Sequence, residues 1–405
     1  MSSFLILYFI KLVLGDANMR AIPNLDQKAR RFNIIICGSA DLSEYNPSDV
    51  FQMPIRKGIV IGLHEDYTIE DIAKSLGVSE EEVLNHLKFL REAEYVTERN
   101  GCLIPTFFIA LKDDVLRAKD MAKHIGKELA ERYESSWSLI EETYRKLSVS
   151  HRFSFDRVSF VLVGAYSLDM YMLEEFAEEG KIMPKAPKRK AGCFYMWGVE
   201  DGMDSLGRYG MHLDEIGEYG YATFGGEIER RRRSPPDHWL RILLELMCEK
   251  SMADALTKFM KLPASERERT VKAINEITLK VLGEYEKRYY DSGYKLSPEA
   301  EKYLKEWLYI DEKLTPLTPI YTREDMLMIR DFAKKMSTQI FNVIYKNLNK
   351  IKDTFKKCKA SRYASFAEFF CWLYHLTFTE TIDHLIMKQK LKTPIHGYEY
   401  WIWKK

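Results

Sequence analysis

Residues 68–77 have the spacing of a short capped helix. Thr68 precedes IEDIAKSL, and Asp71 lies three residues after Thr68. This is the arrangement of a helix N-cap with an acidic partner in the first turn. Gly77 supplies the left-handed residue that commonly ends a helix. We therefore predict a helix that begins at Ile69 and ends before Gly77.

A second helix follows directly. Ser79 and Glu82 have the spacing of a capping box, in which each side chain satisfies a backbone amide of the other residue. Val83, Leu87 and Leu90 then fall on one face, at spacings of four and three residues. Two short capped helices joined by a tight turn are typical of a helix-turn-helix.

Two β-strands are predicted after these helices. The segments YVTER and CLIPTFFI flank Asn100-Gly101, the dipeptide most typical of a two-residue hairpin turn. A hairpin in this position forms a wing beside the helices. The pattern predicts a winged helix-turn-helix domain of the α+β type over residues 53–111.

These residues resemble the winged helix-turn-helix domain of ArsR-type transcriptional regulators. The pattern of that family is an apolar turn, a Ser, a Val, a His-Leu pair and a Leu-containing helix end before the wing. The residues that match in register are Val78, Ser79, Val83, His86, Leu87, Leu90 and Val96. The resemblance covers about 60 of the 405 residues and implies the family's fold, its dimerisation and its binding of double-stranded DNA.

The outward face of the second helix departs from the family. Small hydroxylic residues and a basic residue commonly occupy this face in ArsR-type proteins, whereas Glu81, Glu82, Leu84 and Asn85 occupy it here. Residues 53–112 hold seven basic and ten acidic residues, a poor balance for contact with phosphates. The thiolate or histidine ligands at helical spacing that metal-sensing members carry are also absent from the sequence.

Two interpretations of the consecutive acids Glu80, Glu81 and Glu82 stay open. Acidic residues in the first turn complement the helix dipole and can face solvent beside DNA, and a carboxylate can accept a hydrogen bond from cytosine N4. Alternatively, the winged helix docks onto another protein. On the first interpretation, which we favour, the expected DNA contacts are Thr68, Ser79, Glu81, Glu82, Asn85, His86, Lys88, Arg99 and Asn100.

Helical spacing dominates the rest of the chain. Residues 112–148 predict one long connecting helix of about 50 Å, either a dimer seam or a helix packed along its own C-terminal domain. Residues 149–405 predict a helical C-terminal domain, with a buried helix at 158–176 and a short strand at 396–405. Further helices are predicted at 238–260, 264–290, 298–309, 323–357 and 364–389.

The segment 192–226 has a different composition. It contains nine of the 21 glycines, separated by aromatic residues, which predicts a small β meander with tight turns. Aromatic walls with a few polar groups suit a small-molecule pocket, and ordinary packing over helices is the alternative. The candidate ligand-binding residues are Trp197, Glu200, Asp201, Tyr209, His212 and Tyr221.

Charge and cysteine content limit the remaining classes. Lys plus Arg is 61 and Asp plus Glu is 60, so a local patch must supply any contact with nucleic acid. The run RRRRSPP at 230–236 is a solvated loop or, alternatively, a phosphate or partner contact. The six cysteines form no CxxC pair, which argues against a zinc knuckle or a disulfide framework and favours the cytoplasm. Cys102 is expected to be a buried small apolar residue.

The first part of the chain, residues 1–52, is predicted to be an extension and linker. The apolar run at 4–14 is too short to span a bilayer, and it lacks the basic region and cleavage site of a secretion signal. The turn-rich GSADLSEYNPSD at 38–49 then leads to a domain boundary near Met53.

No catalytic motif was found. The sequence has no GxSxG, Walker-type loop or GxGxxG after a strand. His375 and His384 are nine residues apart, so they would lie on opposite faces of a helix and could not share a metal ion. We therefore expect no catalytic residue, metal or cofactor.

These observations predict a mainly α protein with an N-terminal winged helix and a large helical domain that carries a small β insertion. The expected function is a homodimeric transcriptional regulator that binds DNA and senses a small molecule through the C-terminal domain. The alternatives are a protein-interaction module and an enzyme built on 192–226 with an accessory winged helix.

Overall fold

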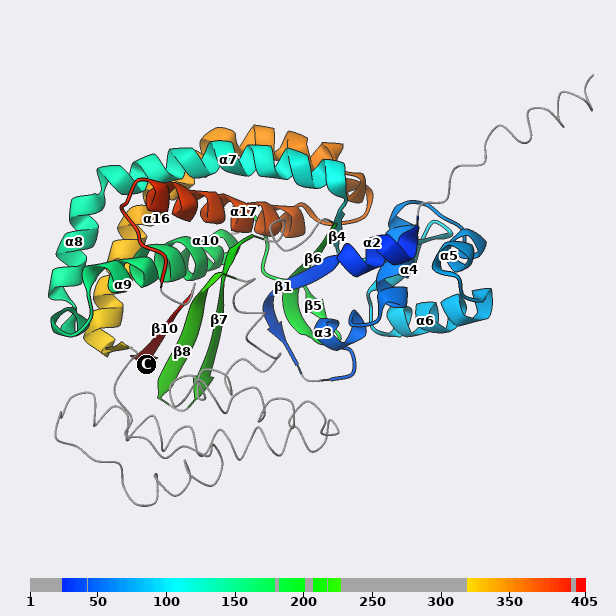
Figure 1. Ribbon diagram of the computed structural model, residues 1–405, viewed down its shortest axis with the longest axis horizontal. Helices are drawn as coiled ribbons and strands as arrows, with labels where there is room; N and C mark the ends of the chain where they lie inside the picture. The colour runs from blue at the N-terminus through cyan, green and yellow to red at the C-terminus, as the bar shows by residue number, and fades with distance from the viewer. Residues whose placement is uncertain are drawn as a thin grey trace, which may run out of the picture.

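A computed structural model shows a mainly helical molecule with three β-sheets among its described residues (Figure 1). The winged helix lies at one end, and long helices lie at the other. The structure describes residues 24–41, 43–178, 182–200, 207–216, 218–226, 319–394 and 398–405. The segments 4–14, 230–236, 238–260, 264–290 and 298–309, which carry predictions above, lie outside these residues.

The winged helix-turn-helix is confirmed as a fold. Its helices are α4 (Pro54–His64), α5 (Ile69–Leu76) and α6 (Glu80–Glu92). Strands β2 (Val96–Arg99) and β3 (Cys102–Pro105) pair antiparallel to form the wing. The apolar faces of the helices and the wing meet in one buried cluster.

The helix starts and turns follow the local signals in the sequence. Thr68 and Asp71 form the complete capping box, and Gly77 has a φ of 69° at the end of α5. The second box is only half formed. The Glu82 amide donates to the Ser79 hydroxyl at 3.1 Å, but among the described residues no hydrogen bond joins the Glu82 carboxylate to the Ser79 amide.

The prediction of a linker before the winged helix is wrong for its described part. Helix α2 (Leu25–Arg31) packs on α4, and the short helix α3 (Pro47–Val50) leads into the domain. Strand β1 (Asn33–Ala40) lies between them and pairs antiparallel along its whole length with β6 (Gly192–Val199). The strand forms because a partner far away in the sequence is available, which local turn signals do not reveal.

Strand β6 is the centre of the first sheet, which we call the shared sheet. Strands β1 and β5 (Lys188–Arg189) pair antiparallel with β6, and β4 (Phe108–Ala110) pairs parallel with it. Strand β4 directly follows the wing, so the sheet contains strands from before, within and after the winged-helix segment.

The two faces of the shared sheet support different cores. Phe194 and Met196 are buried in the cluster that contains the winged helix. Tyr195 and Trp197 are buried in the larger cluster of the C-terminal helices. Successive side chains of a strand point to opposite faces, and each large buried apolar side chain contributes about 1.5–3 kcal/mol. The sheet therefore binds the winged helix and the helical region into one unit.

The long connecting helix predicted for 112–148 is two helices. Helix α7 (Lys112–Ser135) ends where α8 (Trp137–Lys146) begins, and the chain turns between them (Figure 1). Two further long helices lie beside α7: α16 (Arg323–Lys357) and α17 (Phe366–Met387). The bounds of α16 are those predicted from the sequence, and those of α17 differ by two residues at each end.

The apolar face of α7 is used within the chain. A Cβ on Gly126 would lie 2.9 Å from the Thr377 carbonyl oxygen, so this glycine permits close approach to α17. The apolar residues of α7 buried in the core cluster with the neighbouring helices are Val115, Ala118, Ala122, Ile125, Leu129, Ala130 and Tyr133. Of the two roles considered for this segment, the structure shows packing along its own C-terminal region.

The buried helix predicted at 158–176 is present but irregular. It consists of α9 (Phe155–Phe160), the π-helix η2 (Val161–Tyr171) and α10 (Met172–Glu178). A short 3-10 helix, η1 (Ser148–His151), precedes it. Almost every residue of η2 is buried, which explains why its sequence is apolar on all sides.

The predicted meander over 192–226 is divided between two sheets. Strand β6 belongs to the shared sheet, whereas β7 (Tyr209–Ile216) and β8 (Tyr219–Gly226) form a separate sheet with β10 (Tyr398–Lys404) and β9 (Ile320–Tyr321). The order in this second sheet is β7-β8-β10-β9. Strand β10 confirms the strand predicted at the end of the sequence.

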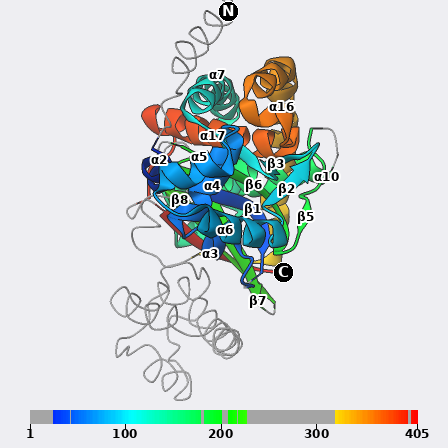
Figure 2. The ribbon, with the colours of Figure 1, turned by 90° about the vertical axis from the view of Figure 1, so that its right-hand side faces the viewer.

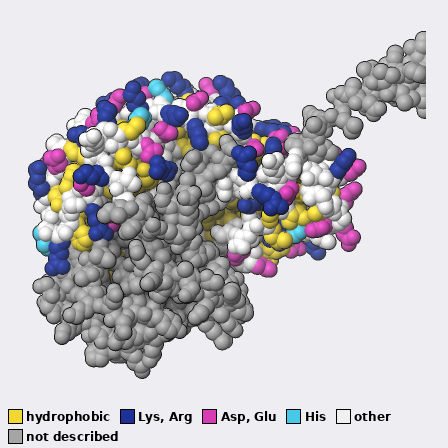
Figure 3. Space-filling model, viewed as in Figure 1, with side chains coloured by type: hydrophobic (Ala, Val, Ile, Leu, Met, Phe, Trp, Pro, Cys, Tyr) yellow, Lys and Arg dark blue, Asp and Glu magenta, His cyan; other side chains and the backbone are white. Residues whose placement is uncertain are grey.

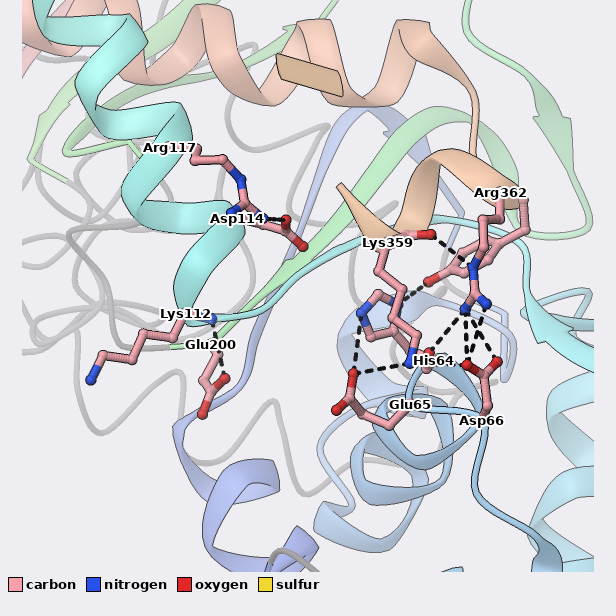
Figure 4. Close-up of polar contacts among 10 residues, drawn as sticks. His64, Glu65, Asp66, Lys112, Asp114, Arg117, Glu200, Lys359 and Arg362 are labelled. Atoms are coloured by element: carbon pink, nitrogen blue, oxygen red, sulfur yellow. Dashed lines mark hydrogen bonds and ion pairs between the residues drawn. The ribbon is translucent and has the colours of Figure 1, made fainter. Parts of the chain in front are cut away.

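A polar joint connects the end of α4 with η4, the 3-10 helix Lys359–Arg362 between α16 and α17 (Figure 4). Its members come from two segments almost 300 residues apart. They are His64, Glu65, Asp66, Lys359, Arg362 and Tyr363. Sequence reasoning gave no signal for the joint, because neither segment carries a recognisable motif.

Buried and exposed contacts combine in this joint. The Tyr363 hydroxyl and Nδ1 of His64 form a hydrogen bond of 2.6 Å, and the His64 side chain is only 1% exposed. Around this bond, Arg362 donates to Asp66 at 3.1 Å and the Lys359 amine lies 3.0 Å from the same carboxylate. The neutral pair is protected from water, while the ion pairs at the rim are partly exposed and contribute less.

A second buried contact joins β5 to α17 and to the end of the wing. Arg189 donates to the Glu368 carboxylate at 2.5 Å and to the Thr106 carbonyl at 3.2 Å. Burial raises the pKa of Glu368 to about 7, although the guanidinium of Arg189 opposes that rise. Removal of either partner would leave a buried polar group without its partner.

We expect His64 to make the stability of the protein depend on pH. Burial, and then the charges of Lys359 and Arg362, lower the pKa of His64 to about 3 in the folded chain, below its ordinary 6.5. Between these values the unfolded chain binds the proton more readily, so stability is full above pH 6.5 and is lost as the pH falls toward 3. The free energy of unfolding should fall by up to about 1.4 kcal/mol per pH unit from this residue.

Urea unfolding at a series of pH values tests this expectation. His64→Gln should remove that part of the slope, whereas His124→Gln, which changes an exposed histidine on α7, should leave the slope unchanged. Equal slopes for the natural protein and His64→Gln would contradict the assignment.

Candidate nucleic-acid interface

Helix α6 presents one polar face to solvent because its other face is in the core. Val83, Leu87 and Leu90 are buried against α4 and α5, as their spacing predicts. The N-cap at Ser79 fixes where the helix begins, and therefore which residues form its first turn. The exposed residues of α6 are Glu80, Glu81, Glu82, Leu84, Asn85, Lys88, Arg91 and Glu92.

Four of the residues expected to contact DNA lie on this outward face. Glu81, Asn85 and Lys88 are spaced by four and three residues, so they form one stripe along the helix, and Glu82 is exposed beside them. Leu84 is 51% exposed in the same region. This stripe could enter a groove, since no described element of the chain covers it.

His86 lies away from the stripe. It is half-buried, and Arg56 of α4 donates to its Nδ1 at 3.5 Å. The Arg56 guanidinium also stacks over the Phe89 ring, 4.1 Å from its centroid. Burial, followed by the charge of Arg56, lowers the pKa of His86, which favours the neutral ring. The observed contacts of His86 are therefore internal to the domain.

Thr68 and Ser79 are exposed at the starts of α5 and α6, where they serve as caps. The Thr68 hydroxyl donates to the Asp71 carboxylate at 2.8 Å, and Ser79 accepts from the Glu82 amide. Both hydroxyl groups therefore have a structural role, whether or not they also face a phosphate.

The wing places two further expected contacts at its tip. Asn100 and Gly101 have φ values of 54° and 74°, the left-handed conformation that a tight hairpin turn requires. Arg99 and Asn100 are exposed there. Cys102 is also exposed, so the prediction that it is buried is wrong: β3 begins at the hairpin tip, where its first residue has no core to face.

The residues proposed as a ligand pocket are not one cluster. Trp197 is on β6 and Tyr209 is on β7, in different sheets. The Glu200 carboxylate accepts from the Lys112 backbone amide at 3.3 Å, so it serves at the start of α7 (Figure 4). His212 and Tyr221 lie on β7 and β8, but their side chains are outside what the structure describes, as is Asp201.

Trp197 and Tyr209 do contact the same helix. The Trp197 ring centroid lies 5.1 Å from that of His375 on α17. The Tyr209 hydroxyl donates to Asp383, two turns further along α17, at 3.0 Å. The Trp197 indole nitrogen is buried and has no hydrogen-bond partner among the described residues. Such a buried donor is uncommon and would be satisfied by a bound polar molecule or water.

The described part of the chain contains no group of three or more His, Cys, Asp or Glu side chains placed to hold a metal ion. The described cysteines are free thiols, and Cys248 lies outside the described residues. They are Cys37, Cys102, Cys193, Cys358 and Cys371. None of the described helices is both long enough and apolar enough to span a bilayer.

Comparison with known proteins identifies one part of the chain. Residues 63–98, from the end of α4 into β2, match the family model described as bacterial regulatory protein, arsR family. No curated protein and no solved structure matches the chain. The matched residues contain α5, α6 and most of the first wing strand. Residues 63–98, which are 36 of the 405, are therefore similar to the helix-turn-helix of the arsR family.

Proposed function

We propose that this protein is a cytoplasmic transcriptional regulator that binds duplex DNA as a homodimer, with α6 in the major groove and the wing beside it. The observation that carries the proposal is an arsR-family helix-turn-helix whose outward face is free of contacts with the rest of the described chain. Asn85 is suited to read adenine, and Lys88 and Arg99 are suited to contact phosphates or guanine. The homodimer rests on the family alone.

In this regulator, the region around α17 senses the effector. The support is the contact of Trp197 and Tyr209 with this helix and the buried indole donor of Trp197. An effector that displaced α17 from β6 would change the position of the winged helix, because both pack on the shared sheet. The proposal includes no catalytic step.

A second candidate function is protein docking by the winged helix. Glu80, Glu81 and Glu82 give the start of α6 a concentrated negative charge, and Leu84 adds an exposed apolar side chain next to them. A basic partner protein with an apolar pocket would fit this surface better than a phosphate backbone would.

Fluorescence anisotropy with duplexes across a salt series tests the first proposal. We expect the protein to bind its own promoter region more tightly than random duplex, with an affinity that falls as salt rises because phosphate contacts release counterions. Absence of binding at every salt concentration would refute the proposal and favour protein docking.

Single substitutions on α6 separate base reading from phosphate contact. Asn85→Ala should reduce the preference for the promoter roughly 5- to 150-fold, the effect of losing a bidentate base contact. Lys88→Ala should weaken binding to both duplexes alike. It should also reduce the slope of log binding constant against log salt concentration by about 0.9. Lys146→Ala, an exposed site on α8, serves as the control. If Asn85→Ala keeps the wild-type preference for promoter over random duplex, Asn85 does not read the base sequence.

The triple variant Glu80→Ala, Glu81→Ala, Glu82→Ala separates the two functions. If α6 binds DNA, loss of three negative charges should tighten binding to random duplex, because repulsion of phosphates is removed. If α6 docks a protein, the variant should lose that partner in a pull-down from the source cell while its duplex affinity stays undetectable.

A further inference from the structure

The C-terminal half of α16 and the adjoining η4 carry a concentration of positive charge. Residues 346–362 contain seven basic residues and a single acid, Asp353. By contrast, residues 53–112 contain seven basic and ten acidic residues. We call the five bases in this half of α16 the lysine surface: Lys346, Lys350, Lys352, Lys356 and Lys357.

Three of these lysines have no partner among the residues that the structure describes. Lys346 pairs with Glu128 at 2.9 Å, and Lys356 pairs with Asp353 at 3.4 Å. Lys350, Lys352 and Lys357 are exposed and make no hydrogen bond or ion pair with any residue that the structure describes. No described residue therefore neutralises their charge.

The neighbouring half of α7 carries mixed charge, because residues 112–128 contain five basic and four acidic residues. Lys346 contacts Glu128, while the charge of Asp114 adds to burial in raising the pKa of Cys358, so the two helix halves run antiparallel side by side. Figure 4 shows the Lys112 side chain pointing away from its neighbours, and Figure 3 shows basic and acidic side chains interspersed along the edge over α7. The exposed bases on this half of α7 are Lys112, Arg117, Lys123 and Lys127, and the exposed acids are Asp113 and Asp120. Arg117 pairs with Asp114 at 2.6 Å.

The chemistry of the lysine surface favours a polyanion. Lysine is depleted in protein–protein interfaces, whereas lysines clustered along a helix are the electrostatic footprint of nucleic-acid binding. Flexible ammonium groups suit phosphates, which need charge more than fixed geometry. The winged helix has an excess of acids and so lacks much of the charge on which duplex affinity depends.

The joint holds this region in a fixed place relative to the winged helix. Arg362 and Lys359, which follow the lysine surface in the chain, pair with Asp66 beside α5. Figures 1 and 2 both place α4 between α7 and α6, so the lysine surface, which lies on the neighbour of α7, and α6 are on different sides of the winged helix. One stretch of straight duplex would therefore not be expected to touch both.

We propose that the lysine surface binds the phosphate backbone of duplex DNA outside the stretch read by α6, and that it supplies most of the salt-dependent affinity. This inference rests on the proposed function of the winged helix. It follows that a duplex extended on both sides of the α6 site binds more tightly than one trimmed to that site.

The test compares two triple variants with the same change in charge. The first variant, which we call the α16 variant, removes the unpaired lysines by the substitutions Lys350→Gln, Lys352→Gln and Lys357→Gln. The second variant is the matched control and carries Lys146→Gln, Lys388→Gln and Lys392→Gln. These three exposed lysines lie on α8, at the end of α17 and just after α17, and each pairs with an acid. Anisotropy is measured for each with extended and trimmed promoter duplex over a salt series, and urea unfolding checks that both variants are folded.

On extended duplex, we expect the plot of log binding constant against log salt concentration to be shallower for the α16 variant than for the wild type. The slope should differ by about 2 to 3, because each lost phosphate contact contributes about 0.9. The matched control should keep the wild-type slope, and trimmed duplex should bind the wild type and the α16 variant alike. Equal slopes for the two variants, with wild-type binding intact, would overturn this inference and leave the proposed function standing.

Two other outcomes are distinct. In the first, the protein binds promoter and random duplex equally, and binding depends on the three lysines but not on Asn85. This result would support the lysine surface and overturn the reading role of α6. Binding of the wild type to phosphatidylserine-containing vesicles but to no duplex would assign the surface to a membrane and overturn the inference.

Discussion

One strand that serves two cores is the constraint on which the rest of the structure depends. In β6, Phe194 and Met196 face the winged helix, while Tyr195 and Trp197 face the C-terminal helices. Side chains alternate along a strand, so a sheet that is apolar on both faces must be covered on both. The winged helix covers one face and α17 helps to cover the other. The helix-turn-helix is thus part of a single packed body.

This arrangement determines how α6 can respond to events elsewhere. The joint around His64 and the buried Arg189–Glu368 pair add polar contacts to the apolar packing of the shared sheet. They hold the winged helix at two more points against η4 and α17. A movement of α17 at the Trp197–His375 contact acts on the same strand that supports the winged helix. In the proposed regulator, the route from effector to DNA therefore passes through β6.

The charges of the molecule divide recognition between two regions. The first turn of α6 is acidic, and its polar stripe offers base contacts with little charge. The lysine surface offers unpaired charge and no rigid reading element. Phosphate contacts supply affinity and base contacts supply specificity, so a protein can place them on different elements. The acids of α6 are then compatible with DNA binding, since they stabilise the helix while the phosphate contacts lie elsewhere.

The sequence by itself determined the elements whose signals are local. Thr68 with Asp71, Gly77, and the Asn100-Gly101 turn specified α5, α6 and the wing, and periodicity specified α16, because caps, turns and helical spacing act over a few residues. The exposed stripe of Glu81, Asn85 and Lys88 followed from the same spacing.

Only the tertiary structure decided which distant segments meet. It paired β1 with β6, divided the glycine-rich segment between two sheets, broke the long helix after Ser135, and joined His64 to Tyr363. It also placed the lysines of α16 beside α7 and left three of them without a partner among the described residues. These contacts depend on packing and strand pairing between residues far apart in the chain, and no short stretch of sequence carries that information.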